Sequence, residues 1–554
     1  RKSDFDMDTV TNIILNNEYD LHEKEEKIES PKEENYKKIN MKYLNIIILL
    51  LLTTSFYSCN DYLDEIPEKS SGIVISKVEE LDALLSKNNF SGGAILDNNF
   101  ASILCSDCFE ITPEYYDAGL SAASDFIESY QISCWEMPYT SNTNVLTSMW
   151  ATNFESIYLA NLILSSVDEV SGSEEAKANV KYKAHFLRAY NYLELVNYYC
   201  MPYGKSTLSE LGLPIKRSTS YEEDMHRASL EETYNFIEAD IIEAVKLKAP
   251  LFDNSGRKSW KETGATVNAL AARFYLAKED YETAQKYAEE ALKYGNDILD
   301  FNNSSEIDQT FTMCMADMSM VPVSTWWDAN DGELSLTIGS RDRSYYSKNN
   351  YYMTTLWGIP SQKLLTSYNQ QYDLRYKYFI VKEFQKIYFM GFYADKFTRN
   401  IPGYGTYGNL YSTAPNVAEM MLIRAECLAR NNHPNEAMQA LNDFRKYRIA
   451  NNAPDEVLKL TANNKDEAIK LVMEERMREF PFTLRWNDIR RCNFNTDPND
   501  DVTITRNFYN IDQYSVDTGN IKTYTLTPQS RRYAVAIPNA DIIAGNGDIE
   551  QNKY

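Results

Sequence analysis

Residues 186–199 read Phe186-Leu-Arg-Ala-Tyr-Asn-Tyr-Leu-Glu-Leu-Val-Asn-Tyr-Tyr199. Apolar side chains recur here with the period of an α-helix that buries one face. They are Phe186, Leu187, Tyr190, Leu193 and Val196. The pattern predicts a helix over residues 178–199, which ends before Pro202 because proline cannot continue a helix.

Segments on both sides of this helix carry the same period. Ser229 followed by Glu232 is typical of a capping box, in which each side chain accepts from the backbone N–H of the other residue. This pair predicts that a helix begins at Leu230. The remaining predicted helices cover 76–85, 150–167, 230–247, two segments joined near Glu279-Asp280 within 266–295, 418–431, 436–450 and 465–480.

Two of the predicted helix pairs have tetratricopeptide-like spacing of small and aromatic residues. The first pair carries Ala272, Tyr275, Tyr281, Ala284, Ala288 and Ala291, and the second carries Ala425, Leu428, Ala437, Leu441 and Phe444. Small residues let two antiparallel helices approach closely. The sequence therefore predicts a mainly α fold, with a tetratricopeptide-like helical-pair scaffold over about 150–295 and 416–491.

A long, irregular insertion separates the two halves of this scaffold, over about 296–415. Residues 326–411 hold 3 Trp, 13 Tyr and 5 Phe in 86 residues, which is 24% aromatic against 13% for the whole chain. Long irregular segments on a rigid scaffold usually carry function. We expect most of these rings to pack a second small core, and the rest to face a ligand together with a second insertion over about 100–145.

The charge and the tyrosine content of the chain indicate which kinds of partner it can bind. The 554 residues include 56 basic and 80 acidic side chains, a net charge of −24, so the chain repels phosphate backbones and nucleic acid is not an expected partner. Tyrosine is abundant, with 41 residues. Its flat apolar face and polar tip suit an amphipathic or ring-shaped ligand.

The first part of the chain predicts an exported lipoprotein. Lys42 precedes a short apolar run, Ile46–Leu52, and Ser58-Cys59 follows. The run is too short to span a bilayer, which takes roughly 20 residues. A buried helix is the alternative interpretation. We expect residues 1–40 to be an upstream extension, 41–58 a signal peptide, Cys59 the lipidated N-terminus, 59–72 a tether, and 73–554 a single domain.

Nothing in the sequence predicts catalysis, a cofactor or a bound metal. The histidines are only four, at positions 22, 185, 226 and 433, and no metalloprotease, serine-hydrolase or phosphate-loop motif is present. Asp497-Pro-Asn499-Asp-Asp501 alternates oxygen ligands like a calcium loop, but Val502 stands where the loop needs glycine.

The cysteine pattern is compatible with a disulfide, a metal site or free thiols. Cys105-x-x-Cys108 together with Cys134 could form a disulfide or bind a metal, although the fourth ligand of a zinc site is missing. Without Cys59 the number of cysteines is odd, which excludes a complete disulfide framework. We expect free, half-buried thiols.

Several blocks in order resemble the SusD/RagB family of outer-membrane lipoproteins from Bacteroidetes. The most recognisable is the helix of residues 186–199. The others are Cys59-Asn-Asp-Tyr-Leu-Asp-Glu-Ile-Pro67, Trp150 with Tyr158 and Asn161, Ala418–Glu426, Leu441-Asn-x-x-Arg445, Glu474–Phe480 with Arg485–Arg491, and Ile537-Pro538 with Gln551–Tyr554. One departure from the family pattern is Phe480-Pro481-Phe482-Thr483. The charged residues of these blocks predict ion pairs between scaffold helices: Arg188, Glu426, Glu475, Arg476 and Asp488.

The resemblance implies a binding protein at the cell surface, anchored to outer-membrane lipid through Cys59. Such proteins cover a SusC-like, TonB-dependent transporter and capture an oligosaccharide before import. The alternative is the same architecture binding peptides, as RagB-like members do. A plain tetratricopeptide scaffold for protein partners is a third hypothesis, which explains neither the aromatic insertion nor the anchor.

Candidate ligand contacts combine aromatic rings with amides and carboxylates, because a sugar presents apolar C–H faces and hydroxyls that need directed hydrogen bonds. One loop supplies this mixture in Trp326, Trp327, Asp328 and Asn330. Further candidates are Tyr345 and Tyr346 in the same insertion, and Tyr115, Tyr116 and Trp135 in the earlier one.

Overall fold

The computed structural model describes residues 75–90, 96–97, 100–117, 127–137, 148–220, 222–303, 309–313, 320–324, 343–346, 349–351, 359–381, 403–404, 410–512 and 515–554. The predicted extension, signal peptide, lipid-anchor cysteine and tether, residues 1–72, therefore lie outside the described residues. The described residues all belong to one compact unit, Ile75–Tyr554.

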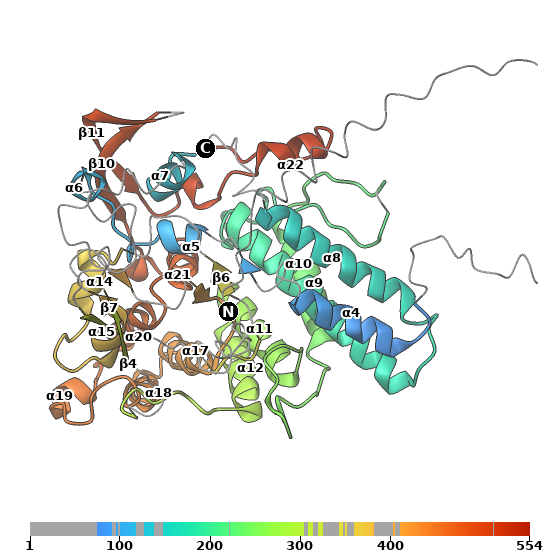
Figure 1. Cartoon of the computed structure of the whole chain (residues 1–554), viewed down its shortest axis with the longest axis horizontal. Helices are drawn as coiled ribbons and strands as arrows, with labels where there is room; N and C mark the ends of the chain where they lie inside the picture. The colour runs from blue at the N-terminus through green and yellow to red at the C-terminus, as the bar shows by residue number, and fades with distance from the viewer. Residues whose placement is uncertain are drawn as a thin grey trace, which may run out of the picture. The chain divides into compact units, whose positions relative to one another are not determined.

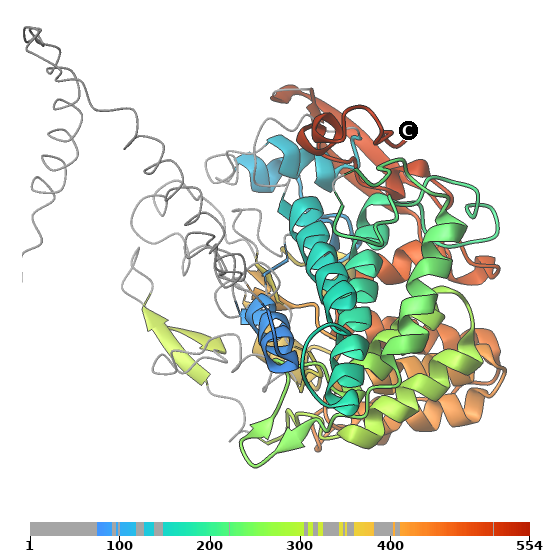
Figure 2. The ribbon, with the colours of Figure 1, turned by 90° about the vertical axis from the view of Figure 1, so that its right-hand side faces the viewer.

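The first half of the scaffold is a series of helices in which consecutive members pack together. These are α8 (Ser148–Ser166), α9 (Glu174–Tyr199), α10 (Leu230–Ala244), α11 (Gly264–Ala277) and α12 (Tyr281–Tyr294). Figure 2 shows α8 and α9 side by side. The predicted capping box is present, since the Ser229 side chain accepts from the Glu232 N–H and the Glu232 side chain accepts from the Ser229 N–H. The predicted face of α9 is also confirmed, because Phe186, Leu193 and Val196 are buried.

The second half continues the same packing after the insertion. It contains α17 (Val417–Arg430), α18 (Pro434–Arg445), α20 (Lys465–Glu479) and α21 (Arg485–Cys492). Helix α17 packs on both α12 and α18, so the two predicted helix pairs stack directly although an insertion separates them in sequence. Ala284, Ala288 and Ala291 of α12 are fully buried, as is Ala425 of α17. The mainly α fold is confirmed.

Shorter elements surround this scaffold (Figure 1). The helices are α4 (Val78–Phe90), α5 (Phe100–Leu104), α6 (Pro113–Asp117), α7 (Ile127–Ser133), α14 (Gln362–Ser367), α15 (Leu374–Phe379), α19 (Asp455–Leu458), α22 (Asn539–Ala544), and the 3-10 turns η5 (Pro498–Asp500) and η6 (Arg531–Tyr533). The three-stranded sheet has the order β1-β6-β9, with β1 (Leu96–Asp97) parallel to β6 (Asn349–Tyr351) and β9 (Leu410–Ser412) antiparallel to it.

The other strands form antiparallel pairs. They are β2 (Phe252–Asp253) with β3 (Gly256–Arg257), β4 (Gln309–Met313) with β5 (Met320–Ser324), β7 (Ile380–Val381) with β8 (Gly403–Tyr404), and β10 (Ile504–Ile511) with β11 (Val516–Leu526).

The β10–β11 hairpin is the longest strand pair among the described residues, and the sequence analysis did not predict it. Its register pairs Ile504 with Leu526 and Phe508 with Lys522, and it shifts between Tyr509 and Asn510. The hairpin lies beside α6 and α7 (Figure 1), and its buried Phe508 stacks on Tyr130 of α7 with ring centroids 5.7 Å apart. Tyr116 of α6 packs on the same hairpin, and α6 carries two of the candidate ligand residues.

Candidate ligand-binding site

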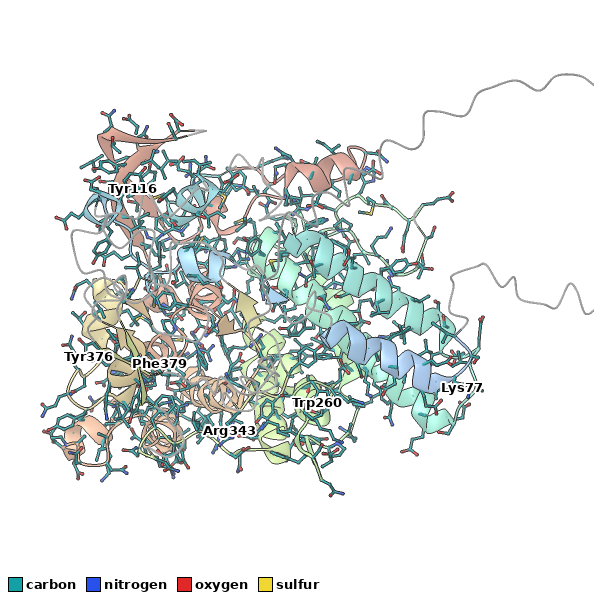
Figure 3. All side chains as sticks on the ribbon, in the orientation of Figure 1. Lys77, Tyr116, Trp260, Arg343, Tyr376 and Phe379 are labelled. Atoms are coloured by element: carbon teal, nitrogen blue, oxygen red, sulfur yellow. The ribbon has the colours of Figure 1, made fainter. Side chains whose placement is uncertain are left out.

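Helix α6 holds the predicted ligand residues that the structure leaves accessible. Tyr115 and Tyr116 are half-buried and Asp117 is exposed. The ring of Tyr116 meets Phe508 and Tyr509 edge-on, at centroid distances of 5.7 and 5.6 Å. Figure 3 labels Tyr116 next to the β10–β11 hairpin. The hairpin therefore supports one side of the Tyr116 ring, while part of its surface remains open.

A side-chain hydrogen bond connects the same two elements. The hydroxyl of Tyr509 donates to Asp117 Oδ2 over 2.8 Å, and this bond raises the pKa of Tyr509. Burial raises the pKa of Tyr115, with the nearby Glu110 and Glu114 adding to the shift. Both phenols are therefore neutral at physiological pH, and the O–H proton of Tyr509 is already engaged by Asp117. The half-buried rings of Tyr115 and Tyr116 beside the exposed Asp117 carboxylate supply ring faces and polar groups of the kind that a sugar needs.

Trp326, Trp327, Asp328 and Asn330 lie outside the described residues, so their predicted contact with a ligand stays a prediction.

Tyr345 and Tyr346 are core residues in this structure, which corrects the expectation that they face a ligand. Tyr345 is 0% exposed, and its hydroxyl donates to the Gly295 carbonyl over 2.6 Å. Tyr346 is 3% exposed and packs against Phe186 and Tyr190 of α9, at centroid distances of 5.1 and 5.6 Å. The pair anchors the insertion to the scaffold and offers no ring face to solvent.

Trp135 requires the same correction. It is 1% exposed, its indole N–H donates to the Cys105 carbonyl over 3.2 Å, and the Arg506 guanidinium lies 4.6 Å from its ring centroid. Its backbone is left-handed, with φ at 55°, where the chain turns after α7. Trp135 was a candidate because it lies in the earlier insertion, and here a backbone carbonyl provides the partner that a buried indole N–H needs.

The three neighbouring thiols are free and fully buried, not half-buried as expected. Burial raises the pKa of Cys105 and of Cys134 to about 12, and it also raises the pKa of Cys108. Because the thiolate is the reactive form, these side chains are inert packing groups at physiological pH.

The predicted ion pairs between scaffold helices are present. Arg188 of α9 reaches Asp240 of α10 at 2.8 Å, and Arg476 of α20 reaches Asp488 of α21 at 2.9 Å. Glu426 of α17 accepts from Arg491 of α21. These carboxylates are already engaged by guanidinium groups, which hold the pKa values of Glu426 and Asp488 below their ordinary range despite burial. Such groups cross-link helices and are not poised for acid–base chemistry.

The segment that resembled a calcium loop uses its oxygens within the protein. Asp500 accepts from Arg430 over 2.6 Å and from Asn495, and Asp497 accepts from the Asn499 N–H. Elsewhere in the described part of the chain, Asp224, His226 and Asp548 form one group with metal-ligating atoms close together. The sequence analysis did not find this group, because Asp548 is distant along the chain. All three side chains are exposed.

Taken together, the stacked helix pairs, the aromatic surface at α6 and the neutralised interior carboxylates define a helical binding scaffold. Two family models match it. One, described as starch-binding and associating with the outer membrane, matches residues 61–276, and the other, described as the SusD family, matches residues 250–554. The second match alone covers more than half of the chain. The protein belongs to the SusD/RagB family.

Solved structures agree on the fold. A SusD superfamily protein from Bacteroides thetaiotaomicron is 14% identical, with a TM-score of 0.56 over 86% of this chain and 100% of that one. A SusD-like carbohydrate binding protein from Bacteroides vulgatus is 16% identical, with a TM-score of 0.53 over 85% of this chain and 97% of that one. A laminarin binding SusD-like protein is 14% identical, with a TM-score of 0.53 over 86% of this chain and 99% of that one.

The search of curated proteins found no match to this sequence. Among the described residues, no helix has the length and apolar character that crossing a bilayer requires.

Proposed function

We propose that this protein is a substrate-binding lipoprotein of the cell surface. It captures an oligosaccharide and delivers it to a SusC-like, TonB-dependent transporter in the outer membrane. Family membership supports this proposal, as does the description of one matching family model as starch-binding and associated with the outer membrane. Two proteins of similar structure are a laminarin binding SusD-like protein and a SusD-like carbohydrate binding protein.

The observation that carries the proposal is the accessible pair Tyr115 and Tyr116 beside Asp117. Both side chains pack against the core before a ligand arrives, and the β10–β11 hairpin supports the Tyr116 ring. A pre-ordered ring loses little conformational entropy on binding, which raises affinity. Trp326, Trp327, Asp328 and Asn330 are proposed as further ligand contacts.

Binding without cleavage is part of the proposal. A glycosidase needs two free carboxyl groups flanking the bond that breaks. The interior carboxylates Glu426, Glu475 and Asp488 are each held by arginines. Turnover of any glycan by the purified protein, abolished by a point mutation, would contradict this part.

Calorimetry against a panel of glycans and peptides tests the function. The soluble Cys59→Ala protein is expected to bind at least one glycan, while a peptide hit without a glycan hit would replace oligosaccharide by peptide as the substrate class. Binding of neither class would refute the capture function.

Alanine substitutions then test the site. Tyr116→Ala should weaken glycan binding by about ten-fold to a thousand-fold, because a ring contact adds about 0.5–1.5 kcal/mol to roughly 1–3 kcal/mol of buried area. Tyr158 of α8 is 41% exposed and provides the matched control, since Tyr158→Ala removes an exposed tyrosine elsewhere on the scaffold. Trp326→Ala and Trp327→Ala should act like Tyr116→Ala. A lowered thermal midpoint with unchanged affinity would identify any of these as a packing residue.

A further inference from the structure

The two segments proposed to contact the ligand lie in stretches of sequence without a single cationic side chain. Residues 88–176, which include α6, contain 13 Asp or Glu and no Lys, Arg or His. Residues 294–340, which include Trp326 and Trp327, contain 8 Asp or Glu and again no Lys, Arg or His. The whole chain has 56 Lys or Arg in 554 residues, so their absence from both stretches is a local feature and not only a consequence of the net charge.

Three carboxylates lie close to the accessible tyrosine rings of α6. Burial raises the pKa of Tyr115, and the negative charges of Glu110 and Glu114 raise it further, which places both carboxylates near this ring. Burial also raises the pKa of Tyr116, and Asp117 adds to that shift. Glu114 and Asp117 belong to α6 itself, and both are exposed. A ligand that covers the two rings therefore meets negative charge.

The neighbouring elements do not offset this charge. The β10–β11 hairpin and α14, which both contact the segment around α6, carry three cationic side chains. Arg506 is 6% exposed and donates to backbone carbonyls inside the core. Lys522 lies 2.8 Å from Glu136, and Lys363 lies 2.6 Å from Asp107. Within these described elements, each cation is thus already engaged.

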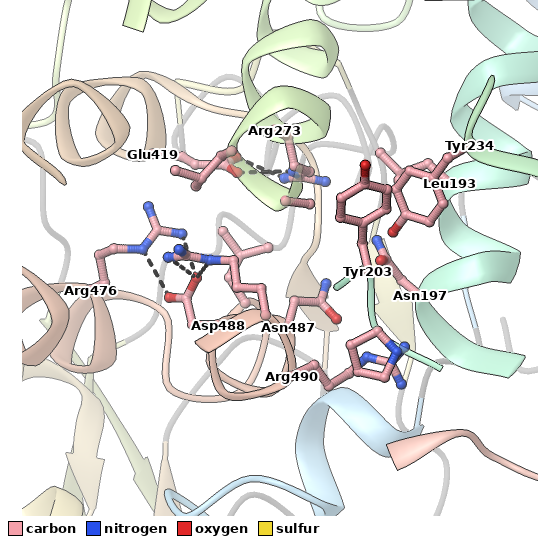
Figure 4. Close-up of a pocket in the computed structure, with 15 residues that line it drawn as sticks. Leu193, Asn197, Tyr203, Tyr234, Arg273, Glu419, Arg476, Asn487, Asp488 and Arg490 are labelled. Atoms are coloured by element: carbon pink, nitrogen blue, oxygen red, sulfur yellow. Dashed lines mark hydrogen bonds and ion pairs between the residues drawn. The ribbon is translucent and has the colours of Figure 1, made fainter. Parts of the chain in front are cut away.

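Many other cationic groups lie in the interior of the scaffold. Buried arginines number 13 in the described part of the chain. Figure 4 shows two of them around an interior pocket, where Arg273 donates to Glu419 over 2.7 Å and Arg476 donates to Asp488 over 2.9 Å. These charges compensate one another between helices, so they are not available to an acidic ligand at the surface.

We infer that the ligand of the α6 surface carries no acidic groups, so that the protein takes oligosaccharides of uncharged sugars and rejects uronic acid and sulfated glycans. This inference deepens the proposed capture of an oligosaccharide and rests on it. Like charges that face each other across an interface suppress the wrong partner. The hydroxyls of an uncharged sugar can instead donate to the same carboxylates, so Glu114 and Asp117 accept from one class of glycan and repel the other.

Matched pairs of glycans test this preference, because the two forms of each glycan share a backbone. Any uncharged oligosaccharide that binds is oxidised at its primary hydroxyls to the uronate, and any acidic one that binds is carboxyl-reduced. Calorimetry with the Cys59→Ala protein measures both forms, in a buffer with a chelator so that no divalent cation bridges two carboxylates. In about 0.01 M salt the uncharged form should bind about ten-fold to a hundred-fold more tightly. In about 1 M salt the difference should narrow, because the screening length falls from about 30 Å to about 3 Å.

The possible results separate the charge preference from the capture function. Equal or tighter binding of the acidic form would overturn the inference and leave the capture function intact. A difference that salt does not change would reflect a lost hydroxyl contact instead of charge, and would overturn the inference as well. Binding of neither form of any glycan would refute the capture function itself.

The double variant Glu114→Gln with Asp117→Asn removes two of the carboxylates and keeps both rings. The amide oxygen at position 117 can still accept from the Tyr509 hydroxyl, so the bond that supports α6 remains. The ratio of the affinities for the uncharged and the acidic form should fall by about three-fold to ten-fold at low salt. A change in the packing of α6 would weaken both forms and would cancel in this ratio.

The double variant Glu282→Gln with Glu436→Gln is the matched control. It removes two exposed carboxylates from α12 and α18, which lie near the bottom of Figure 1, whereas α6 lies near the top. The control should retain the affinity ratio of the Cys59→Ala protein. An unchanged ratio in the α6 variant, or an equal fall in both variants, would contradict the assignment of charge selectivity to α6.

Discussion

Single charged residues determine how this scaffold is held together. Glu475 of α20 is 0% exposed and lies among three guanidinium groups, with Arg445, Arg375 and Arg478 at 2.5, 2.6 and 2.8 Å. These arginines come from three different elements, and they hold the pKa of Glu475 well below its ordinary range although burial acts in the opposite direction. One carboxylate thus joins α20 to α18 and α15.

Glu475→Gln should destabilise the protein by about 3–5 kcal/mol, because removing one partner leaves buried charges without compensation. Urea denaturation measures this change. Glu289→Gln is the matched control, since Glu289 is 43% exposed and its partner Arg424 is 3.5 Å away. An exposed pair contributes about 0–1 kcal/mol. Equal losses in the two variants would contradict a structural role for the buried cluster.

The same carboxylates predict acid sensitivity. The folded-state pKa values of Glu426 and Glu475 lie below the ordinary value of 4.5. Their contribution to stability is therefore complete above the pKa of the unfolded state and is lost as the pH falls toward the folded-state pKa. The urea midpoint should decline steeply below about pH 4.5, and less steeply in Glu475→Gln. A decline of the same slope in both proteins would show that other groups control acid unfolding.

For single residues, the sequence predicted the pairing of charged side chains better than it predicted which aromatic rings face a ligand. Arg188, Glu426, Glu475, Arg476 and Asp488 could be assigned to buried pairs, because a charge inside a helical core has few alternatives to a partner. The sequence could not show whether Tyr345, Tyr346 and Trp135 are buried or exposed. Tyrosine and tryptophan combine an apolar ring with a polar group, which suits both a core and a ligand site. In the structure, backbone carbonyls of Gly295 and Cys105 satisfy the buried Tyr345 hydroxyl and the buried Trp135 indole.

The sequence predicted helices correctly where apolar residues recur with helical spacing over a long segment. Several scaffold helices begin close to their predicted positions, and a side chain caps the start of some of them, as Ser229 does for α10 and Asn464 for α20. The β10–β11 hairpin was missed because its pattern is short and interrupted. Residues 518–523 of β11 are exposed, and a register shift follows Tyr509, so no regular alternation extends along both strands.

This hairpin leads to a prediction about α6. Tyr509→Phe removes the hydroxyl that bonds Asp117 and should loosen α6 without removing the ring that supports Tyr116. A hydrogen bond contributes about 0.5–1.5 kcal/mol, so glycan affinity should fall by about two-fold to ten-fold. Calorimetry measures this change. Tyr524→Phe is the control, because its hydroxyl bonds the Tyr509 carbonyl in the same hairpin and does not reach α6. An unchanged affinity in Tyr509→Phe would place the ligand away from α6.

The whole molecule builds one continuous scaffold from two separate stretches of sequence. Helix α12, which precedes the insertion, packs on α17, which follows it, and Arg273 of α11 forms a buried pair with Glu419 of α17 at 2.7 Å. The insertion thus begins and ends on a rigid support, which is where binding loops are expected. Sequence motifs identified this scaffold and its family. They could not place the insertion, because its segments lack a period that dictates which side chains point inward.

The proposed lipid anchor at Cys59 allows glycan binding to be tested separately from delivery to the transporter. If Cys59 carries the lipid, Cys59→Ala should move the protein from the membrane fraction to the soluble fraction, because burial of an acyl chain contributes about 0.8 kcal/mol per CH₂ group. Its glycan affinity in solution should not change, since α6 and the scaffold lie far from Cys59 along the chain. Fractionation of cells with immunodetection measures the first outcome, and calorimetry the second. Cys59→Ala protein that stays with the membrane would contradict the anchor, whereas a soluble variant that binds glycan but no longer supports uptake would show that delivery to the transporter requires attachment to the membrane.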